Sequence, residues 1–461
     1  MGALRGRLLA RWSAAPRGLV VALAVGALVR IAWVVWAARP PADALTDPGQ
    51  YLTMADGFAM GRWPTIGAYQ TAFYPPGWSM LLAPAAWLAM RTGWFELMDA
   101  AVALNVVLGT ASIWLTARLA TRWMGARAAV PAAWIMAVSP PTIFYTSTAL
   151  AETAATALVL WSLDRAGGPD EDRAAGSAGR TDALLAAGAL AGAAVLVRTS
   201  GLALVALPWL LHRARGGRWR GAGATARPFL AGLALVLLPW GLVSGLVVGH
   251  WSPLPSGGAS ALCTGHRDGA TGRGDNIAEC YVGSVFDQPS LYPSDHPGAR
   301  TARGVVDEQE WYRRTSAEAL RWALTHPGEE LRLVAAKTWA LLSNQRDALI
   351  AAEDWNRNPL VGPRLEAALQ ALGDLWLWSL YALVAVALRT RPRARRAVPV
   401  WGLPLVFLLI AFAGVAFNRY AHPIWPLLAV LAAASWVPGP AGRPLAADDP
   451  PRYAPEHVNA C

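Results

Sequence analysis

The residues DPGQYLTMADGFAMGRWPTIGAYQTAFYPPGW, Asp47 to Trp78, follow the first long apolar segment of the chain, 18–38. Their Pro and Gly residues favour tight turns, which indicates a shaped loop just outside a membrane helix. A carboxylate beside lipid is costly to place and hard to explain by packing. The stretch therefore predicts a membrane protein of many spans that works at the surface of the bilayer.

The composition supports this prediction. Of the 461 residues, 55% are hydrophobic and 15% are charged, whereas soluble domains carry about 25% charged residues. The net charge of +10 does not indicate nucleic-acid binding, because the basic residues are Arg apart from Lys337 and cluster in short loops between apolar runs. Basic residues placed in this way set the orientation of membrane helices.

The fold class we expect is an all-α polytopic membrane protein. A spanning helix needs about 20 mostly apolar residues. Ten segments are candidates: 18–38, 99–119, 127–141, 144–163, 183–198, 200–212, 228–249, 366–388, 398–417 and 421–437. The run 78–90 is too short to span and is expected to lie at the interface.

The Arg clusters fix the expected topology. They lie at 5–17, 118–127, 213–227 and 389–396. With ten spans and a cytoplasmic N-terminus, all four fall on the cytoplasmic side, as the positive-inside rule requires. We thus expect a multi-pass protein of the plasma membrane with both termini in the cytoplasm and its active face outside.

This topology divides the chain into four regions. They are an N-terminal transmembrane module, 1–249, with a catalytic first outer loop, 39–98; an outer region, 250–365; C-terminal transmembrane helices, 366–438; and a disordered cytoplasmic tail, 439–461. The outer region carries two amphipathic helical patterns, 308–323 and 329–342, separated by a break at His326-Pro327-Gly328.

Cys263 and Cys280 share the outer region. Disulfides persist outside the cytoplasm, so we expect these two to pair, although two free thiols remain an alternative because sequence does not set the geometry of a pair. The Cys and His residues lack the spacing of metal ligands. We therefore expect no metal and no cofactor.

Five motifs occur in order along the chain: DPGQY from Asp47, YPPGW from Tyr74, SPPTIFYTSTALAE from Ser139, GALAGAAVLVRTSGL from Gly188 and FNRYAHPIWPLL from Phe417. Together they resemble the GT-C glycosyltransferases, in particular the bacterial relatives of the protein mannosyltransferases and lipid A aminoarabinose transferases. The resemblance extends from about Val20 to Trp436.

This resemblance implies an activity. The family transfers a sugar from a polyprenyl-phosphate carrier to an acceptor on the outer face of the membrane, here a glycolipid, a cell-wall polysaccharide or a protein. Its catalytic carboxylate lies in the first outer loop, often as an Asp-Glu pair. Pro48 follows Asp47 in this chain, so the pair is absent.

Asp47 is the expected general base. A hydroxyl that attacks an anomeric carbon must lose its proton, and a positioned carboxylate can take it. The alternative is a structural one, because DPG is also a good turn sequence. Asp43 and Asp56 are the nearby competitors, of which Asp56 ranks second.

The phosphate of the leaving carrier needs fixed cations, and the planar fork of Arg suits its oxygens. Arg198 and Arg419 fall at the outer ends of apolar spans, where they either bind the phosphate or only reach for the interface. Lys337 and Arg346 lie in or after the amphipathic stretch and are further candidates, with a solvated helix face as the alternative.

The acceptor or the sugar would contact Tyr51, Asp56, Tyr74, Trp78 or Glu152. Glu152 is an acid inside an apolar span, and it could equally form a structural pair with Arg198. The aromatic residues could instead belong to the interfacial belt.

Two other kinds of function stay open. A transporter or flippase of a lipid or small molecule would also need about ten spans, but such proteins are often built from repeated halves, and no repeat is evident. A structural subunit of an envelope-assembly complex is the third possibility, should the absent Asp-Glu pair mean lost activity.

Overall fold

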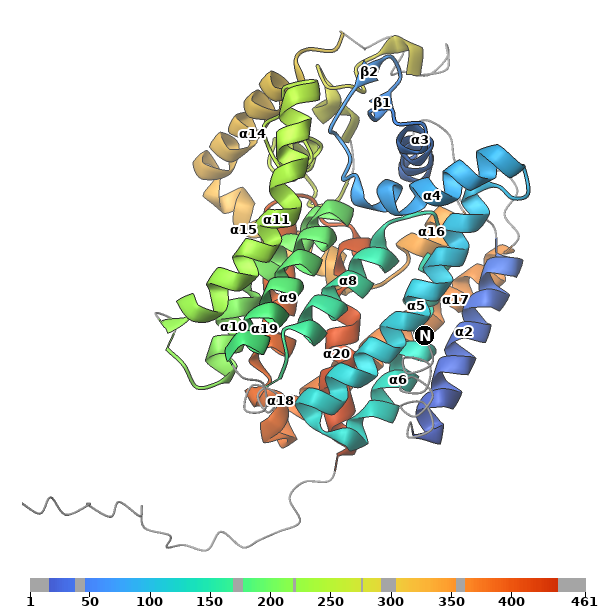
Figure 1. Cartoon of the computed structure of the whole chain (residues 1–461), viewed down its shortest axis with the longest axis vertical. Coiled ribbons are helices and arrows are strands. Elements are labelled where there is room, and N and C mark those ends of the chain that lie inside the picture. The colour runs from blue at the N-terminus through green and yellow to red at the C-terminus, as the bar shows by residue number, and fades with distance from the viewer. Residues whose placement is uncertain are drawn as a thin grey trace, which may run out of the picture.

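The computed structural model describes residues 16–37, 46–168, 177–218, 221–274, 277–291, 304–353 and 361–437, and the predicted tail 439–461 lies outside them. Within these ranges the chain is almost entirely helical, with one short antiparallel hairpin formed by β1 (Thr65–Ile66) and β2 (Tyr69–Gln70). Figure 1 shows a helical bundle with α3, the hairpin and α14 at one end and α18 at the other.

Five helices in the described ranges are long and apolar enough to cross a membrane, which is typical of an integral membrane protein. They are α2 (Arg17–Trp36), α5 (Leu97–Met124), α9 (Ser177–Val197), α11 (Gly223–Val248) and α17 (Pro363–Thr390). A sixth crossing is formed if the bent pair 126–137 and 140–147 counts as one span. The number ten stays a prediction.

Several of the expected spans are shorter or interrupted. Residues 144–163 divide into the 3-10 turn η2 (Tyr145–Ser147), a non-helical stretch and α8 (Glu152–Arg165). Residues 200–212 lie in the 3-10 helix η4 (Thr199–Ala206) and in α10 (Leu207–Ala214). The last two expected spans correspond to α19 (Val398–Phe412) and α20 (Ile424–Ala433), two short apolar helices.

The remaining elements are mostly connections. They are α3 (Asp47–Ala59), α4 (Gly77–Thr92), η1 (Ala126–Ala128), α6 (Ala129–Ala137), α7 (Pro140–Phe144), α12 (Gly258–Gly265), η6 (Ile277–Tyr281), η7 (Pro289–Leu291), α14 (Glu308–Thr325), α15 (Pro327–Leu342), α16 (Asp347–Glu353), α18 (Pro392–Arg396), η8 (Asn418–Ala421) and η9 (Ala434–Trp436). The two amphipathic helices expected in the outer region agree with α14 and α15 to within two residues at each end.

Helices α9 and α11 are in close backbone contact. A Cβ added to Gly188 on α9 would lie 1.9 Å from the carbonyl oxygen of Phe229, and one added to Gly232 on α11 would lie 2.0 Å from that of Leu185. Small residues let membrane helices approach in this way. The contact fixes the position of α9, whose last residue precedes Arg198.

The bend between α6 and α7 is held by a buried arginine of α2. Pro140 and Pro141 have no N–H, so they cannot bond the carbonyls of Met136 and Ala137, four residues earlier. The guanidinium of Arg30 donates to these two carbonyls instead, at 3.1 and 3.2 Å. Arg30 thus replaces the hydrogen bonds that the prolines remove, and the helix pair bends by 60° there.

The non-helical stretch 148–151 is also fastened by side chains. Asn105 donates to the carbonyl of Thr148 at 2.7 Å, and the indole of Trp78 donates to that of Ala149 at 2.8 Å. Irregular backbone among membrane helices is tolerated where it is buried in protein. These bonds set where α8 begins, and its first residue is Glu152.

The two segments predicted from the sequence to lie outside the membrane, 39–98 and 250–365, are called the outer segments, and their described parts meet at Glu308, the first residue of α14. Its buried carboxylate accepts hydrogen bonds from Thr71 and from the backbone N–H of Ala72 in the first segment, and from Ser256 in the second. Beside it lies a small aromatic core in which Phe73 packs on Phe286 and Trp311.

The second outer segment contains a disulfide between Cys263 and Cys280, the pair put forward from the sequence, with a Cα–Cα distance of 5.8 Å. It joins α12 to η6, seventeen residues later in the chain.

Candidate active site

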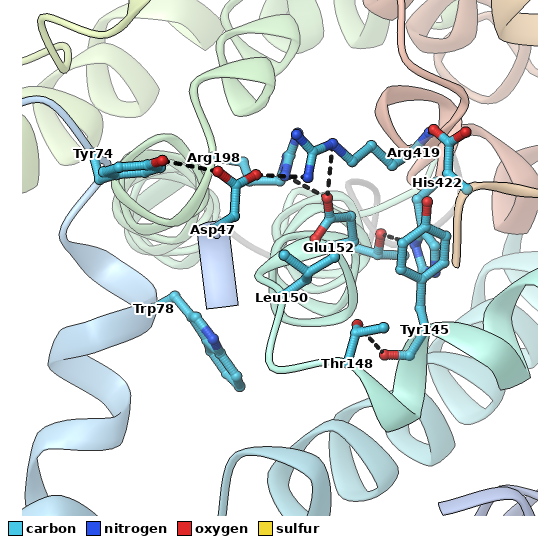
Figure 2. A network of polar contacts seen from close by, with 12 residues as sticks. Asp47, Tyr74, Trp78, Tyr145, Thr148, Leu150, Glu152, Arg198, Arg419 and His422 are labelled. Atoms are coloured by element: carbon cyan, nitrogen blue, oxygen red, sulfur yellow. Dashed lines mark hydrogen bonds and ion pairs between the residues drawn. The ribbon is translucent and has the colours of Figure 1, made fainter. Parts of the chain in front are cut away.

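Side chains from five separate elements meet at the end of the bundle that carries the outer segments (Figure 2). They are Asp47 at the start of α3, Tyr74 before α4, Glu152 at the start of α8, Arg198 after α9 and Arg419 in η8. Each lies in one of the five sequence motifs. The structure thus brings together residues up to 372 positions apart in the chain.

Asp47 is held at the first turn of α3. Thr46 caps this helix by accepting from the N–H of Gly49, and Pro48 fits the first turn because a missing N–H costs nothing there. One oxygen of the Asp47 carboxylate accepts from the Tyr74 hydroxyl at 2.9 Å, and the other lies 2.7 Å from Nη1 of Arg419.

The Asp47 side chain is 27% exposed, whereas that of Glu152 is 1% exposed. Burial alone would raise the pKa of Asp47, but the charge of Arg419 and the hydrogen bonds from Tyr74 and Arg419 outweigh it, so the pKa lies below its ordinary value. Burial, followed by the nearby carboxylate, raises the pKa of Tyr74 well above its ordinary value. The phenol therefore stays protonated and donates to Asp47.

The two arginines share Glu152. Its Oε1 lies 2.5 Å from Nη1 of Arg198 and 3.9 Å from Nε of Arg419. The ring of Tyr420 lies beneath both guanidiniums, with centroid distances of 4.9 Å to Arg198 and 5.9 Å to Arg419. Glu152 and Tyr420 together hold two cations side by side, next to Asp47.

Sequence reasoning missed four members of this cluster, of which Tyr420, beneath the two guanidiniums, is one. Asp347, the first residue of α16, accepts the backbone N–H of Arg419 at 3.1 Å. The rings of Tyr145 and His422 lie edge to face at 4.9 Å, and Nδ1 of His422 lies 2.7 Å from Thr156. His422 belongs to the motif FNRYAH, which could have identified it, whereas Asp347 belongs to none of the motifs.

Two of the predicted aromatic residues border the cluster. The ring of Tyr51 packs against that of Tyr74 at 5.5 Å. Trp78 is fully buried, and its hydrogen bond to the carbonyl of Ala149 holds the stretch 148–151. Asp56 lies farther along α3 and is half-buried, and in the described part of the chain its side chain forms no hydrogen bond or ion pair with the cluster; burial raises its pKa.

The other two predicted cations have partners elsewhere. Lys337 is fully buried in α15, donates to the carbonyl of Phe412 at 2.9 Å, and lies 3.4 Å from Nε2 of His266. Burial lowers the pKa of Lys337 to about 8. Arg346 forms an ion pair with Asp374 of α17. Within the described ranges, neither forms a hydrogen bond or an ion pair with Asp47 or Glu152.

The cluster suits acid–base chemistry next to an anion. It presents a partly exposed carboxylate, two guanidiniums that are only slightly exposed and several phenols within one set of contacts. Among the described residues, no group of three or more His, Cys, Asp or Glu side chains could hold a metal ion.

No protein-family model and no curated protein sequence matches the chain. Among solved structures, ArnT from Cupriavidus metallidurans bound to undecaprenyl phosphate matches 90% of this chain and 77% of its own, at 15% identity and a TM-score of 0.44. The chain is similar in structure to GT-C membrane glycosyltransferases.

The archaeal oligosaccharyltransferase AglB from Archaeoglobus fulgidus, in complex with an inhibitory peptide and a dolichol-phosphate, also matches 90% of this chain, at 16% identity and a TM-score of 0.46. The chain spans about half the length of AglB, since 50% of that protein is covered. These likenesses concern the arrangement of helices.

Proposed function

We propose that this protein is an inverting glycosyltransferase that moves a sugar from a polyprenyl-phosphate donor to an extracytoplasmic acceptor. The observation that carries the proposal is the contact between Asp47 and Arg419, beside Arg198. A candidate base and two candidate phosphate-binding cations lie together, as a displacement at a sugar phosphate requires.

The reaction is a single displacement. An acceptor hydroxyl attacks the anomeric carbon and passes its proton to Asp47, a step that typically contributes about 10²–10⁴-fold to the rate. The bond between the anomeric carbon and the phosphate oxygen breaks, and the polyprenyl phosphate leaves with the electron pair. Arg198 and Arg419 bind the phosphate and stabilise its growing negative charge.

The membrane arrangement proposed from the sequence goes with this reaction: ten crossings, cytoplasmic termini and an outer active face. The interrupted segment 199–214 is compatible with a crossing. Eight 3-10 residues in η4 and eight α-helical residues in α10 together rise roughly 28 Å, close to the thickness of about 30 Å of the hydrocarbon core.

The acceptor is a glycolipid, a cell-wall polysaccharide or a protein, and the donor sugar is bound next to Asp47. Tyr51 and Glu152 border this position and are the side chains proposed to contact the sugar or the acceptor.

The test uses purified protein in nanodiscs with a panel of radiolabelled polyprenyl-phosphate sugars, and follows the release of polyprenyl phosphate. We expect Asp47→Asn to lose about 10²–10⁴-fold in turnover while it still binds donor. Asp56→Asn on the same helix is the competing variant and should retain turnover. Loss of turnover in Asp56→Asn alone would move the base to Asp56, and no turnover with any donor and acceptor in wild type would contradict the proposal.

One observation favours a second candidate, a lipid transporter or flippase. The bent pair 126–137 and 140–147 and the non-helical stretch before Glu152 resemble the broken helices that line transporter binding sites. Movement of labelled lipid across proteoliposome membranes without release of polyprenyl phosphate would favour this candidate.

A further inference from the structure

The ion pair between Asp47 and Arg419 restrains the proposed base. A general base works best when its pKa lies near the operating pH, whereas the guanidinium of Arg419, 2.7 Å away, stabilises the ionised carboxylate and depresses its pKa. In the arrangement seen here Asp47 is therefore a weak base.

Arg419 has capacity for a second partner. Its Nη1 faces Asp47, while its buried Nε makes no hydrogen bond within the described part of the chain and lies 3.9 Å from Glu152. Its side chain is 15% exposed. A phosphate offers several oxygens to a planar guanidinium, so it can compete with a single carboxylate oxygen.

We propose that the donor phosphate takes Arg419 away from Asp47, so that binding of the donor itself turns Asp47 into an effective base. The inference rests on the proposed function and adds an order to it, since the acceptor can be deprotonated only after the donor is bound. Tyr74 donates to the other carboxylate oxygen of Asp47, so the carboxylate keeps its orientation when Arg419 leaves.

The groups around Asp47 allow this exchange to change its protonation. Those that face it or act on it are Tyr74, Arg419, Arg198, Tyr51 and Tyr420, with Glu152 behind the arginines. Arg198 is already paired with Glu152 at 2.5 Å, so it cannot fully replace Arg419 as the counter-charge. The tyrosines stay neutral. Loss of Arg419 should therefore raise the pKa of Asp47, and the nearby phosphate charge should raise it further.

The test measures the protons taken up when a phosphate binds. Farnesyl phosphate is titrated calorimetrically into the protein in nanodiscs, near pH 5 and near pH 7.5, in two buffers of different ionisation enthalpy. An opposite charge typically lowers the pKa of Asp by about 1–3 units. Because loss of Arg419 raises the pKa of Asp47, wild type should take up more protons than Asp47→Asn near pH 5, and no more than it near pH 7.5.

The difference between wild type and Asp47→Asn excludes the proton released by the phosphate itself, because that release is the same in both titrations. Equal uptake by wild type and Asp47→Asn overturns the exchange while leaving the donor class intact. Failure of wild type to bind farnesyl phosphate overturns the proposed function instead.

A third comparison distinguishes the transfer of Arg419 from Asp47 to the phosphate from simple repulsion between the phosphate and the Asp47 carboxylate. In Arg419→Gln the Asp47 carboxylate has already lost its counter-charge, so the proton uptake that depends on Asp47 should be smaller than in the wild-type background. This uptake is the difference between Arg419→Gln and the double variant that also carries Asp47→Asn. Uptake of undiminished size in the Arg419→Gln background would mean that the phosphate acts by repulsion alone, and would overturn the exchange.

Discussion

The hydroxyl of Tyr74 orients the Asp47 carboxylate, and it is the neutral partner in the cluster. Tyr74→Phe removes this donor and keeps the ring that packs on Tyr51. A hydrogen bond to a charged group contributes about 1.5–3 kcal/mol, so turnover should fall roughly 10–100-fold. Without the donor the ionised form is less stable, so the pKa of Asp47 should rise and the acid limb of the rate profile should move to higher pH. Release of polyprenyl phosphate measured against pH checks both effects.

The matched control is Tyr69→Phe, because Tyr69 is 44% exposed in β2 of the same outer segment. Its turnover and pH profile should equal those of wild type. An unchanged acid limb in Tyr74→Phe would mean that the hydroxyl does not act on the titrating group.

The sequence could point to Asp47, Glu152, Arg198 and Arg419, because a charged residue beside or inside an apolar run is unusual enough to notice. Asp347 gave no such signal. It follows Arg346 in a polar segment, where a carboxylate is ordinarily solvated, and only the fold shows that it accepts the N–H of Arg419. The groups that a charged side chain contacts are set by the tertiary structure, which a local sequence pattern does not contain.

At the scale of an element, Arg30 replaces two hydrogen bonds that Pro140 and Pro141 remove. Arg30→Ala would leave the carbonyl of Ala137 unpaired in a buried position, at about 1–3 kcal/mol, and that of Met136 with only a long bond of 3.4 Å from the N–H of Ser139. We expect a clear fall in thermal stability in detergent. Arg30→Lys keeps one charge but lacks the fork that reaches both carbonyls, so its stability should be intermediate.

Arg17→Ala is the control for this prediction, since Arg17 is exposed at the start of the same helix, α2. It should unfold at the temperature of wild type. Stability of Arg30→Ala equal to that of Arg17→Ala would show that the two carbonyls find other donors.

The contact between α9 and α11 predicts different effects on stability when two glycines of α11 are replaced by Ala. A Cβ at Gly232 would lie 2.0 Å from a backbone oxygen of α9, which cannot turn away as a side chain can, whereas a Cβ at Gly223 meets nothing within 4 Å. Gly232→Ala should therefore destabilise the protein by about 1–3 kcal/mol. Gly223→Ala should be neutral or slightly stabilising, because Ala favours helix. Thermal unfolding of the two variants, side by side, would refute the packing if Gly232→Ala were the more stable.

Hydrophobic run length could indicate these elements but not their interruptions. The runs 144–163 and 200–212 are apolar enough to be taken as spans, yet the first contains the stretch 148–151 and the second is half 3-10 helix. The carbonyls of that stretch are satisfied by Asn105 and Trp78, which lie 43 and 71 residues away. A sequence pattern of short period cannot contain such partners.

At the scale of the whole molecule, the two outer segments form one unit over the candidate active site. The Arg clusters predict that both segments lie on the same side of the membrane, but no pattern in the sequence indicates that they bind each other. The aromatic core that contains Phe73 and Trp311 draws on both segments. Phe73 directly precedes Tyr74. Packing of the second segment on Phe73 therefore also fixes the Tyr74 hydroxyl, which donates a hydrogen bond to Asp47.

The joint between the outer segments should depend on pH through Glu308. Burial raises the pKa of this carboxyl, although hydrogen bonds from Ser256, Ala72 and Thr71 oppose the effect. A raised pKa in the folded state means that the docked form favours the neutral carboxyl. The stabilisation is therefore fully present below the ordinary pKa of Glu, about 4.3, and is lost as the pH rises through the folded pKa.

Glu308→Gln removes this titration, so protection of 304–325 against hydrogen exchange should fall with rising pH in wild type and stay level in the variant. Glu310→Gln is the control, because the Glu310 side chain is 51% exposed and forms an ion pair with Arg313 of the same helix. It should follow wild type. A wild-type profile that is flat from about pH 4 upward, or one that rises, would show that the joint does not titrate through Glu308. Thr71, Ala72 and Ser256 are neutral donors, and the charge of His250 also acts on Glu308, so the comparison of wild type with Glu308→Gln decides.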